Sequence, residues 1–264
     1  MSISMKNHVA YISGGSSMMA RGTATAFLEE GGRVVLGDIR QDLLDAAKAD
    51  LVEKGFPAEN IATALVDLTD LKTVPATFDQ AESAFGTVDI LVNIAGVIVG
   101  YYKLDEMREE DWDLTFNINV KGLMEMCREF VKRLKAKRLG GNIVNVSSNG
   151  AKVCFADMAD YNASKAPVMN LTQSMALEWA PDGINVNAVC PGAVDTAMLR
   201  KCMEESMRLY GGTIEEMRKT WGPPQLGRLI QPYEVGRVIR FLASEDAAII
   251  RGQSISVDAG NTRF

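Results

Sequence analysis

The sequence predicts an α/β fold in which helices cover both faces of a seven-stranded parallel sheet, the doubly wound arrangement. Short runs rich in β-branched residues alternate with segments whose apolar residues recur at helical spacing. Several runs, among them VVL, DILVN and NIVNV, are almost continuously apolar, as expected of strands covered on both faces. No repeat, low-complexity tract or Gly/Ser/Pro-rich linker divides the chain, so we expect a single domain over residues 1–264.

The expected elements follow one another in regular alternation. Strands are expected at residues 8–13, 33–37, 61–66, 89–93, 142–147, 184–189 and 254–257. Helices are expected at residues 19–30, 41–53, 71–85, 106–137, 160–179 and 232–243. The exception is the segment 196–224, which we interpret as a helical insertion.

This insertion is rich in methionine, leucine and aromatic residues. They are Met198, Leu199, Met203, Met207, Leu209, Tyr210, Met217 and Trp221. Segments that follow a parallel strand lie beside the crevice in which doubly wound sheets bind ligands. The insertion is therefore interpreted as a substrate lid, with a helix pair that merely packs on the sheet as the alternative.

Composition and charge limit the classes of partner. Of the 264 residues, 47% are hydrophobic and 23% charged, which argues for a folded globular protein. The formal net charge of −6 argues against nucleic-acid binding. The N-terminal segment lacks an apolar signal core and no apolar run is long enough to cross a membrane, so we expect a cytoplasmic protein without a membrane partner.

Histidine and cysteine usage excludes two common kinds of site. His8 is the sole histidine and precedes the first expected strand, so neither a Ser-His-Asp triad nor a multi-histidine metal site is expected. Cys127, Cys154, Cys190 and Cys202 are far apart and form no CxxC pair. Unpaired thiols and no bound metal are the expectation.

A glycine-rich turn, SGGSSMMARG, links the first expected strand to the first expected helix. The next strand ends at Asp38, 24 residues after Gly14. Backbone N–H groups of such a turn can receive a pyrophosphate, and the carboxylate can accept hydrogen bonds from a ribose diol. Alone, the turn is weak evidence, since an ordinary strand–helix turn with a solvated aspartate has the same pattern.

Tyr161 and Lys165 are four residues apart in an expected helix, so their side chains share one face. A nearby ammonium group favours the ionised phenol. Lowering a phenol pKa from ~10 by two or three units requires about 3–4 kcal/mol. The same spacing also occurs in many surface pairs.

Taken together, the motifs of the chain resemble the short-chain dehydrogenase/reductase family, of the NAD-preferring alcohol dehydrogenase type, over essentially the whole length. The matching segments are the glycine turn at 13–20, VDL at 66–68, LVNIAG at 91–96, NVKG at 119–122, NIVNVSS at 142–148, YNASK at 161–165 and PGAVDT at 191–196. The resemblance implies a Rossmann-type, dinucleotide-binding catalytic domain.

The resemblance also implies catalytic roles. Tyr161 would be the general acid/base while hydride passes between substrate and nicotinamide. Ser148 would hydrogen-bond the same substrate oxygen, and strand alternation favours it over Ser147. Lys165 would lower the tyrosine pKa and hold the nicotinamide ribose. Asn119 would support a water that connects Lys165 to solvent.

The implied cofactor is NAD. The residues implied to bind it are Gly14, Ser16, Ser17, Met18, Met19, Asp38, Ile39, Asp67, Leu68, Asn93, Ala95, Gly96, Tyr161, Lys165, Pro191, Gly192, Val194 and Thr196. A carboxylate at Asp38 would repel the 2′-phosphate of NADP and accept the 2′-hydroxyl of NAD. Ile39 stands where NADP users of this family often carry a basic residue, which also favours NAD. Arg40 argues for NADP, because its side chain could swing toward a phosphate.

Three positions depart from the family pattern. Met18 and Ala20 stand where glycines are usual, and Ile94 replaces the second asparagine of the Asn-Asn-Ala-Gly turn. Met18 brings a long side chain to the place where backbone normally approaches the pyrophosphate. We expect weakened or reshaped cofactor binding more than its loss, because methionine is flexible.

The leading expectation for function is interconversion of a secondary alcohol and a ketone with NAD. The apolar insertion favours a bulky, hydroxysteroid-like substrate, whereas Glu204, Glu205 and Arg208 leave a polyol or sugar alcohol open. Alternatives are a non-catalytic dinucleotide-binding scaffold and an enoyl reductase or epimerase. The resemblance further implies a homotetramer.

Overall fold

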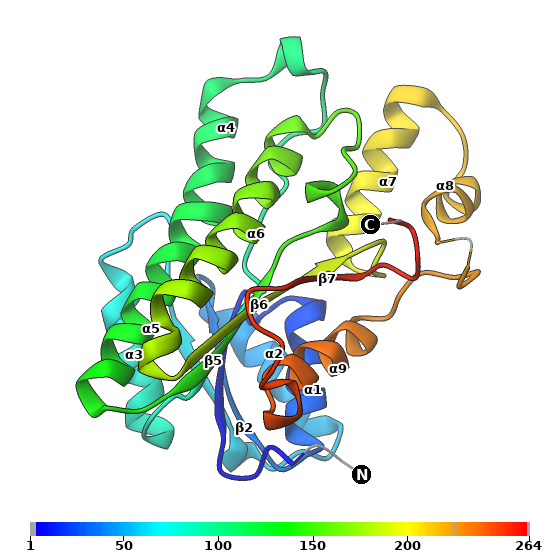
Figure 1. Ribbon diagram of the computed structural model, residues 1–264. Helices are drawn as coiled ribbons and strands as arrows, with labels where there is room; N and C mark the ends of the chain where they lie inside the picture. The colour runs from blue at the N-terminus through cyan, green and yellow to red at the C-terminus, as the bar shows by residue number, and fades with distance from the viewer. Residues whose placement is uncertain (1–3, 224, 263–264) are drawn as a thin grey trace.

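The computed structural model describes residues 4–223 and 225–262. These residues form one seven-stranded parallel sheet in the order β3-β2-β1-β4-β5-β6-β7 (Figure 1). The strands are β1 (Val9–Ser13), β2 (Arg33–Asp38), β3 (Ile61–Leu65), β4 (Ile90–Asn93), β5 (Gly141–Val146), β6 (Ile184–Pro191) and β7 (Ser254–Val257). The predicted doubly wound parallel sheet is confirmed.

Helices cover both faces of this sheet (Figure 1). One face is covered by α1 (Met18–Leu28), α2 (Gln41–Glu53) and α9 (Pro232–Leu242), the other by α3 (Thr73–Phe85), α5 (Leu123–Lys137) and α6 (Ala159–Trp179). Neighbouring residues of β1 supply both apolar clusters: Ile12 packs with Phe27 of α1, and Tyr11 packs with Phe78 of α3. Strand alternation thus sends consecutive side chains into opposite cores.

The helix expected at residues 106–137 is present from Glu109 on, but it begins three residues later than expected and changes its type along its length. The segment contains a 3₁₀ turn at Leu104–Glu106, helix α4 (Glu109–Phe116) and a π-helical stretch at Asn117–Gly122, before α5 begins. Arg108 is extended, which separates the 3₁₀ turn from α4. The apolar spacing did not reveal these changes, because each piece remains helical. π-Helical turns often mark functional positions, and this one holds Asn119.

The insertion consists of two helices, α7 (Ala197–Tyr210) and α8 (Ile214–Trp221). The Thr196 side chain caps α7 by accepting a hydrogen bond from the Leu199 N–H. A helical segment was expected here, while its role as a lid remains a prediction. Residue 224, the end of the predicted insertion, lies outside the described residues.

The centre of the sheet is the point where strand order reverses. β1 pairs with β2 on one side and β4 on the other, with Ser13 opposite Asn93 in the last β1–β4 pair. The connections after these two strands lead to opposite faces of the sheet, which opens a crevice at their carboxyl ends. Within the described part of the chain, no helix is long and apolar enough to span a membrane.

Candidate active site

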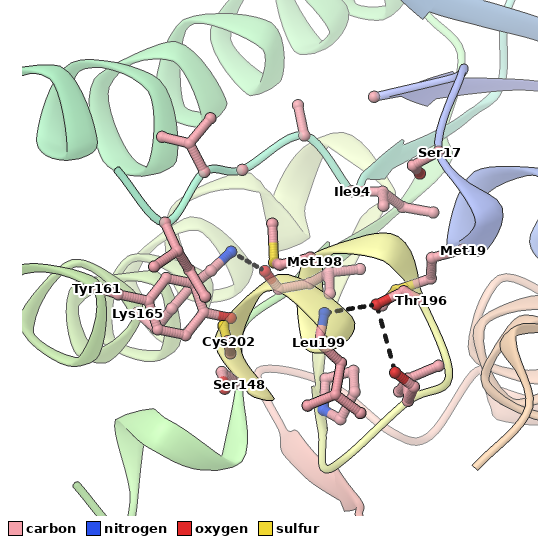
Figure 2. Close-up of a pocket in the computed structure, with 18 of the residues that line it drawn as sticks. Ser17, Met19, Ile94, Ser148, Tyr161, Lys165, Thr196, Met198, Leu199 and Cys202 are labelled. Carbon is pink, nitrogen blue, oxygen red and sulfur yellow. Dashed lines mark hydrogen bonds between the residues drawn. The ribbon is translucent and has the colours of Figure 1, made fainter. Parts of the chain in front are cut away.

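A cavity of about 920 Å³ occupies this crevice. Most of the predicted site residues line it, namely Gly14, Ser16, Ser17, Met18, Met19, Asp38, Ile39, Asp67, Leu68, Ala95, Gly96, Ser148, Tyr161, Lys165, Pro191, Gly192, Val194 and Thr196. Figure 2 shows Ser148 and Tyr161 towards one end of the cavity and Ser17, Met19 and Ile94 towards the other. The sequence motifs therefore converge on one space.

The glycine turn is held against the loop after β4. Gly14 has a φ of +69°, and a Cβ there would lie 2.9 Å from the Ala95 backbone. A glycine is required on both counts. Ser17 then caps α1 by accepting a hydrogen bond from the Ala20 N–H at 3.1 Å. Met18, the first residue of α1, lines the cavity but is not among the described non-glycine residues with positive φ.

Asp38 ends β2 directly beside this turn. Its carboxylate accepts hydrogen bonds from the Ser16 N–H at 3.1 Å and the Ser16 hydroxyl at 2.6 Å. Arg40 is absent from the cavity lining and pairs with Asp42 at 2.5 Å. Sequence reasoning missed Arg21, which lines the cavity from α1 and lies 3.5 Å from Asp50. Arg21 stands one helical turn after Ser17, and this spacing could have identified it as a residue of the cavity wall.

Asn93 and Asn119 are not among the residues that line the cavity. The Asn93 amide donates to Asn145 Oδ1 at 2.9 Å and to Cys127 Sγ at 3.2 Å, so it joins β4 to β5 behind the wall. Asn119 accepts from the Val97 N–H at 2.8 Å and donates to the Val97 carbonyl at 3.0 Å. Asn93 therefore ties side chains together behind the wall, whereas Asn119 fixes the backbone of the loop after β4.

Asn119 nevertheless lies close to Lys165. A Cβ placed on Gly96 would come within 3.1 Å of Lys165 Nζ and 3.2 Å of Asn119 Oδ1. The two side chains thus reach the same glycine, Lys165 from α6 and Asn119 from the π-helical turn. This proximity is what the predicted relay would need, although no direct hydrogen bond joins the two residues.

Tyr161, Ser148 and Lys165 meet where β5 ends and α6 begins (Figure 2). Burial raises the pKa of Tyr161 to about 12, and its hydrogen bond with Ser148 acts in the opposite direction. Lys165 Nζ donates to the Val146 carbonyl at 3.0 Å and lies 5.8 Å from the Tyr161 ring centroid. Burial lowers the pKa of Lys165 to about 8.

The net pKa of Tyr161 is raised rather than lowered, because the cost of burying the charged phenolate outweighs the hydrogen bond with Ser148. The effect of Lys165 on the phenol stays a prediction. The choice of Ser148 over Ser147 has a structural reason. The Ser147 hydroxyl donates to the Lys165 carbonyl at 2.7 Å, whereas Ser148 Oγ accepts from the Gly150 N–H and faces the phenol.

Sequence reasoning missed most of the wall beyond Tyr161. This wall is formed by Val97, Ile98, Tyr101, Asn149, Phe155, Asp157, Met158 and Cys202, together with Met198, Leu199, Tyr210 and Trp221 of the insertion. Met203 is fully buried and, like Met207, does not line the cavity. Helical spacing within α7 could have indicated Cys202, four residues after Met198. The loop residues carried no signal.

Known proteins match this chain along almost its whole length. A family model described as enoyl-(acyl carrier protein) reductase matches residues 14–262. The chain belongs to the short-chain dehydrogenase/reductase family. Members of this family use nicotinamide dinucleotides, and the chain is an oxidoreductase that acts on small molecules.

Three similar members illustrate the range of the short-chain dehydrogenase/reductase family. A cis-4-hydroxycyclohexanecarboxylate dehydrogenase of Sinomonas cyclohexanicum is 36% identical, covering 96% of each chain. An NAD-dependent glycerol dehydrogenase of Listeria innocua is 33% identical over 96% of this chain and 93% of the relative. The crystal structure of a variant of actinorhodin polyketide ketoreductase with NADPH has a TM-score of 0.89 and 29% identity, covering 97% and 98% of the two chains.

Proposed function

We propose that this protein interconverts a secondary alcohol and a ketone with NAD as the hydride carrier. The observation that carries the proposal is the meeting of Tyr161, Ser148 and Lys165 in the cavity that also contains the glycine turn and Asp38. This arrangement provides a proton donor and acceptor at one end and an anion-compatible backbone turn at the other. The catalytic set is Tyr161, Ser148, Lys165 and Asn119.

The residues present fit a dinucleotide. At Gly14, the space that a Cβ would occupy is taken by Ala95 backbone atoms, so only a glycine lets the turn pack against this loop. The N-terminus of α1 follows at once and favours a pyrophosphate. Asp38 would hold the adenosine ribose, and Lys165 the nicotinamide ribose. When bound, the nicotinamide supplies or accepts the hydride.

The protein's own side chains manage the proton. In ketone reduction, the Tyr161 hydroxyl gives its proton to the substrate oxygen, and in alcohol oxidation the phenolate takes it back. Ser148 donates a hydrogen bond to the same oxygen and thereby orients it beside Tyr161. Lys165, held by the Val146 carbonyl, stabilises the phenolate when it forms. Asn119 positions the loop at Val97. From there it would hold a water beside Lys165.

NAD is favoured over NADP by charge at the adenosine end. Asp38 lines the cavity, and a 2′-phosphate there would face its carboxylate. Arg40 is bound to Asp42 outside the cavity lining, so it offers no compensation. Arg21 is the nearest basic alternative on α1. The structural relative contains NADPH, whereas the glycerol dehydrogenase is NAD-dependent. Cofactor preference therefore has to be measured for each member of the family.

The substrate part of the cavity favours a bulky, largely apolar alcohol of hydroxysteroid-like size. Met198, Leu199, Phe155 and Trp221 give it soft, apolar walls that can adapt to a rigid ring system. A polyol is the second candidate, because Asp157 adds a buried carboxylate that could accept hydrogen bonds from further hydroxyl groups. The cyclic hydroxy acid of one relative lies between these two classes.

The direct test is NADH formation by the purified protein with a hydroxysteroid, a hexitol and a small secondary alcohol. We expect the highest kcat/KM for the hydroxysteroid with NAD. Preference for the hexitol overturns the bulky-substrate part of the proposal. Measurable NADH binding without turnover of any alcohol or ketone, in both directions, identifies a non-catalytic scaffold.

Assembly as a homotetramer forms part of the proposal. Trp112 and Leu114 on α4, and Leu177 on α6, are exposed apolar side chains. Exposed apolar residues on helices are suited to contacts between copies of the chain. Light scattering after size-exclusion chromatography measures the mass directly, and a monomer at micromolar concentration would contradict this proposal.

A further inference from the structure

Three polar side chains meet at the substrate end of the cavity. Tyr210 donates a hydrogen bond to Asp157 Oδ2 at 2.5 Å, and Lys103 Nζ lies 3.0 Å from Asp157 Oδ1. Lys103 also donates to the Tyr210 hydroxyl at 2.8 Å. We call this closed triangle of Lys103, Asp157 and Tyr210 the clasp.

Asp157 is the centre of the clasp and is held unusually firmly. Its side chain is 2% exposed, so its charge depends on partners inside the protein. Its backbone has a φ of 65°, in the left-handed region that aspartate tolerates better than most residues. Its carbonyl accepts a hydrogen bond from the Tyr102 N–H at 2.9 Å. Side chain and backbone thus bind the same neighbouring loop.

The clasp joins three segments that form the walls of the substrate space. Lys103 lies in the connection after β4, Asp157 in the loop before α6, and Tyr210 is the last residue of α7. Asp157 and Tyr210 themselves line the cavity. The clasp therefore connects the far end of the insertion to the two loops that face it.

The hydrogen bond between Tyr210 and Asp157 lies at the point where α7 ends. Gly211 and Gly212 follow with φ values of 76° and 98° and end the helix, with the Gly211 N–H donating to the Met207 carbonyl at 2.8 Å. The stacked pair of Phe155 and Trp221, with ring centroids 6.4 Å apart, joins the insertion to the Asp157 loop through α8. At the end of α7 itself, the Tyr210 hydroxyl provides a polar attachment, and one turn earlier Ser206 is hydrogen-bonded to Tyr101.

We infer that Lys103, Asp157 and Tyr210 are specificity-determining residues, which set the size of the substrate space by fixing the end of α7 against the opposite loops. The inference rests on the proposed alcohol–ketone activity and deepens it. The three residues act through the walls they position, so they are positioning residues and take no part in proton or hydride transfer. A large substrate that touches these walls depends on the clasp, whereas a small one beside Tyr161 does not.

Tyr210→Phe is the principal test, because it removes the clasp hydroxyl and keeps the ring. We expect KM for a bulky secondary alcohol to rise about tenfold relative to KM for a small one, with kcat for the bulky substrate changing far less. Lys103→Gln should shift the same ratio in the same direction. An unchanged ratio in both variants overturns the inference.

Tyr233→Phe is the matched control. Tyr233 also donates to a carboxylate, Glu29, at 2.5 Å, but it lies on α9 and does not line the cavity. Its loss should leave the KM ratio and NADH affinity as they are in the parent. A shift as large as that of Tyr210→Phe would show that any lost tyrosine–carboxylate contact has this effect, and would overturn the assignment to the clasp.

Hydrogen exchange measured by mass spectrometry separates this inference from the proposed function. In Tyr210→Phe, peptides covering residues 197–210 should exchange faster than in the parent, while peptides of α1 remain protected. This readout needs no substrate, so it tests the clasp even if no alcohol is turned over. Unchanged exchange across α7 would mean that the clasp does not hold the helix, and the inference would fail.

Discussion

The two ends of the cavity are built in different ways. The cofactor end is formed largely by backbone: Gly14 touches Ala95, α1 begins at Met18, and Asp38 follows on the adjacent strand. The substrate end is formed by side chains from separate loops and from the insertion, such as Tyr101, Phe155 and Met198. The first end follows local rules of turns and helix termini, whereas the second depends on long-range packing.

This difference explains why the sequence reveals the cofactor end of the cavity more readily than the substrate end. A dinucleotide imposes nearly the same backbone requirements in every protein that binds it, so its signature is compact in sequence. A substrate is recognised by whichever side chains a fold brings together, so proteins with one fold can differ in substrate. Reaction type is therefore readable from local motifs, and substrate identity has to be measured.

Tyr161 stands at the junction of the two ends, and its loss should have the largest effect. Tyr161→Phe removes the hydroxyl that moves the proton, so kcat should fall about 10³-fold. NADH affinity should change little, because the ring remains. Steady-state assays and NADH titration measure the two quantities, with Tyr233→Phe as control. Activity within tenfold of the parent would reject Tyr161 as the acid/base.

The pH dependence of the two directions sharpens the role of the same residue. Because burial raises the Tyr161 pKa to about 12, the protonated form that reduction needs is present throughout pH 6–8. Alcohol oxidation needs the phenolate, so its kcat/KM should rise about tenfold per pH unit in that range. An oxidation kcat/KM that stays flat across pH 6–8 would contradict this assignment.

The sheet and most of the cofactor end could be predicted from sequence because both rest on local patterns. The apolar runs identified all seven strands of the described sheet, and Gly14 and Asp38 were found by their order along the chain. Asp157 was missed because its importance lies in partners at positions 103 and 210. The burial that raises the Tyr161 pKa could not be read from the sequence, because it is a property of the folded chain.

Asp38 tests the cofactor end alone. Asp38→Ala removes the charge that would oppose a 2′-phosphate, so the NADP/NAD ratio of kcat/KM should rise about tenfold to a hundredfold. Relative activity towards bulky and small alcohols should not change. Asp45→Ala is a suitable control, since Asp45 is exposed on α2 and bonds to Gln41. A parent that already prefers NADP would refute the cofactor argument.

Met198 tests the substrate end alone. Met198→Glu places a charge in the apolar wall, so KM for a large apolar ketone should rise about tenfold, and KM for a small one much less. Met207→Glu is the matched control on the same helix, because Met207 does not line the cavity. Met203 is fully buried, so a charge there would unfold the region and report nothing about substrate size. Equal effects on large and small ketones would argue against the apolar wall.

Substitutions at Met18 test whether its side chain in the glycine turn weakens cofactor binding. We expect the smallest effect here. Met18→Gly should tighten NADH binding about threefold with little change in the chemical step, because the long side chain leaves the space near the pyrophosphate. Met18 begins α1 without positive φ, so the side chain beyond Cβ is the main obstacle. Met18→Ala should therefore give nearly the same gain in a calorimetric titration. Tighter NADH binding with glycine alone would locate the crowding at the Cβ atom. Unchanged or weaker binding in both variants would show that the turn accommodates methionine. The backbone requirements of the cofactor end would then be less strict than the motif implies.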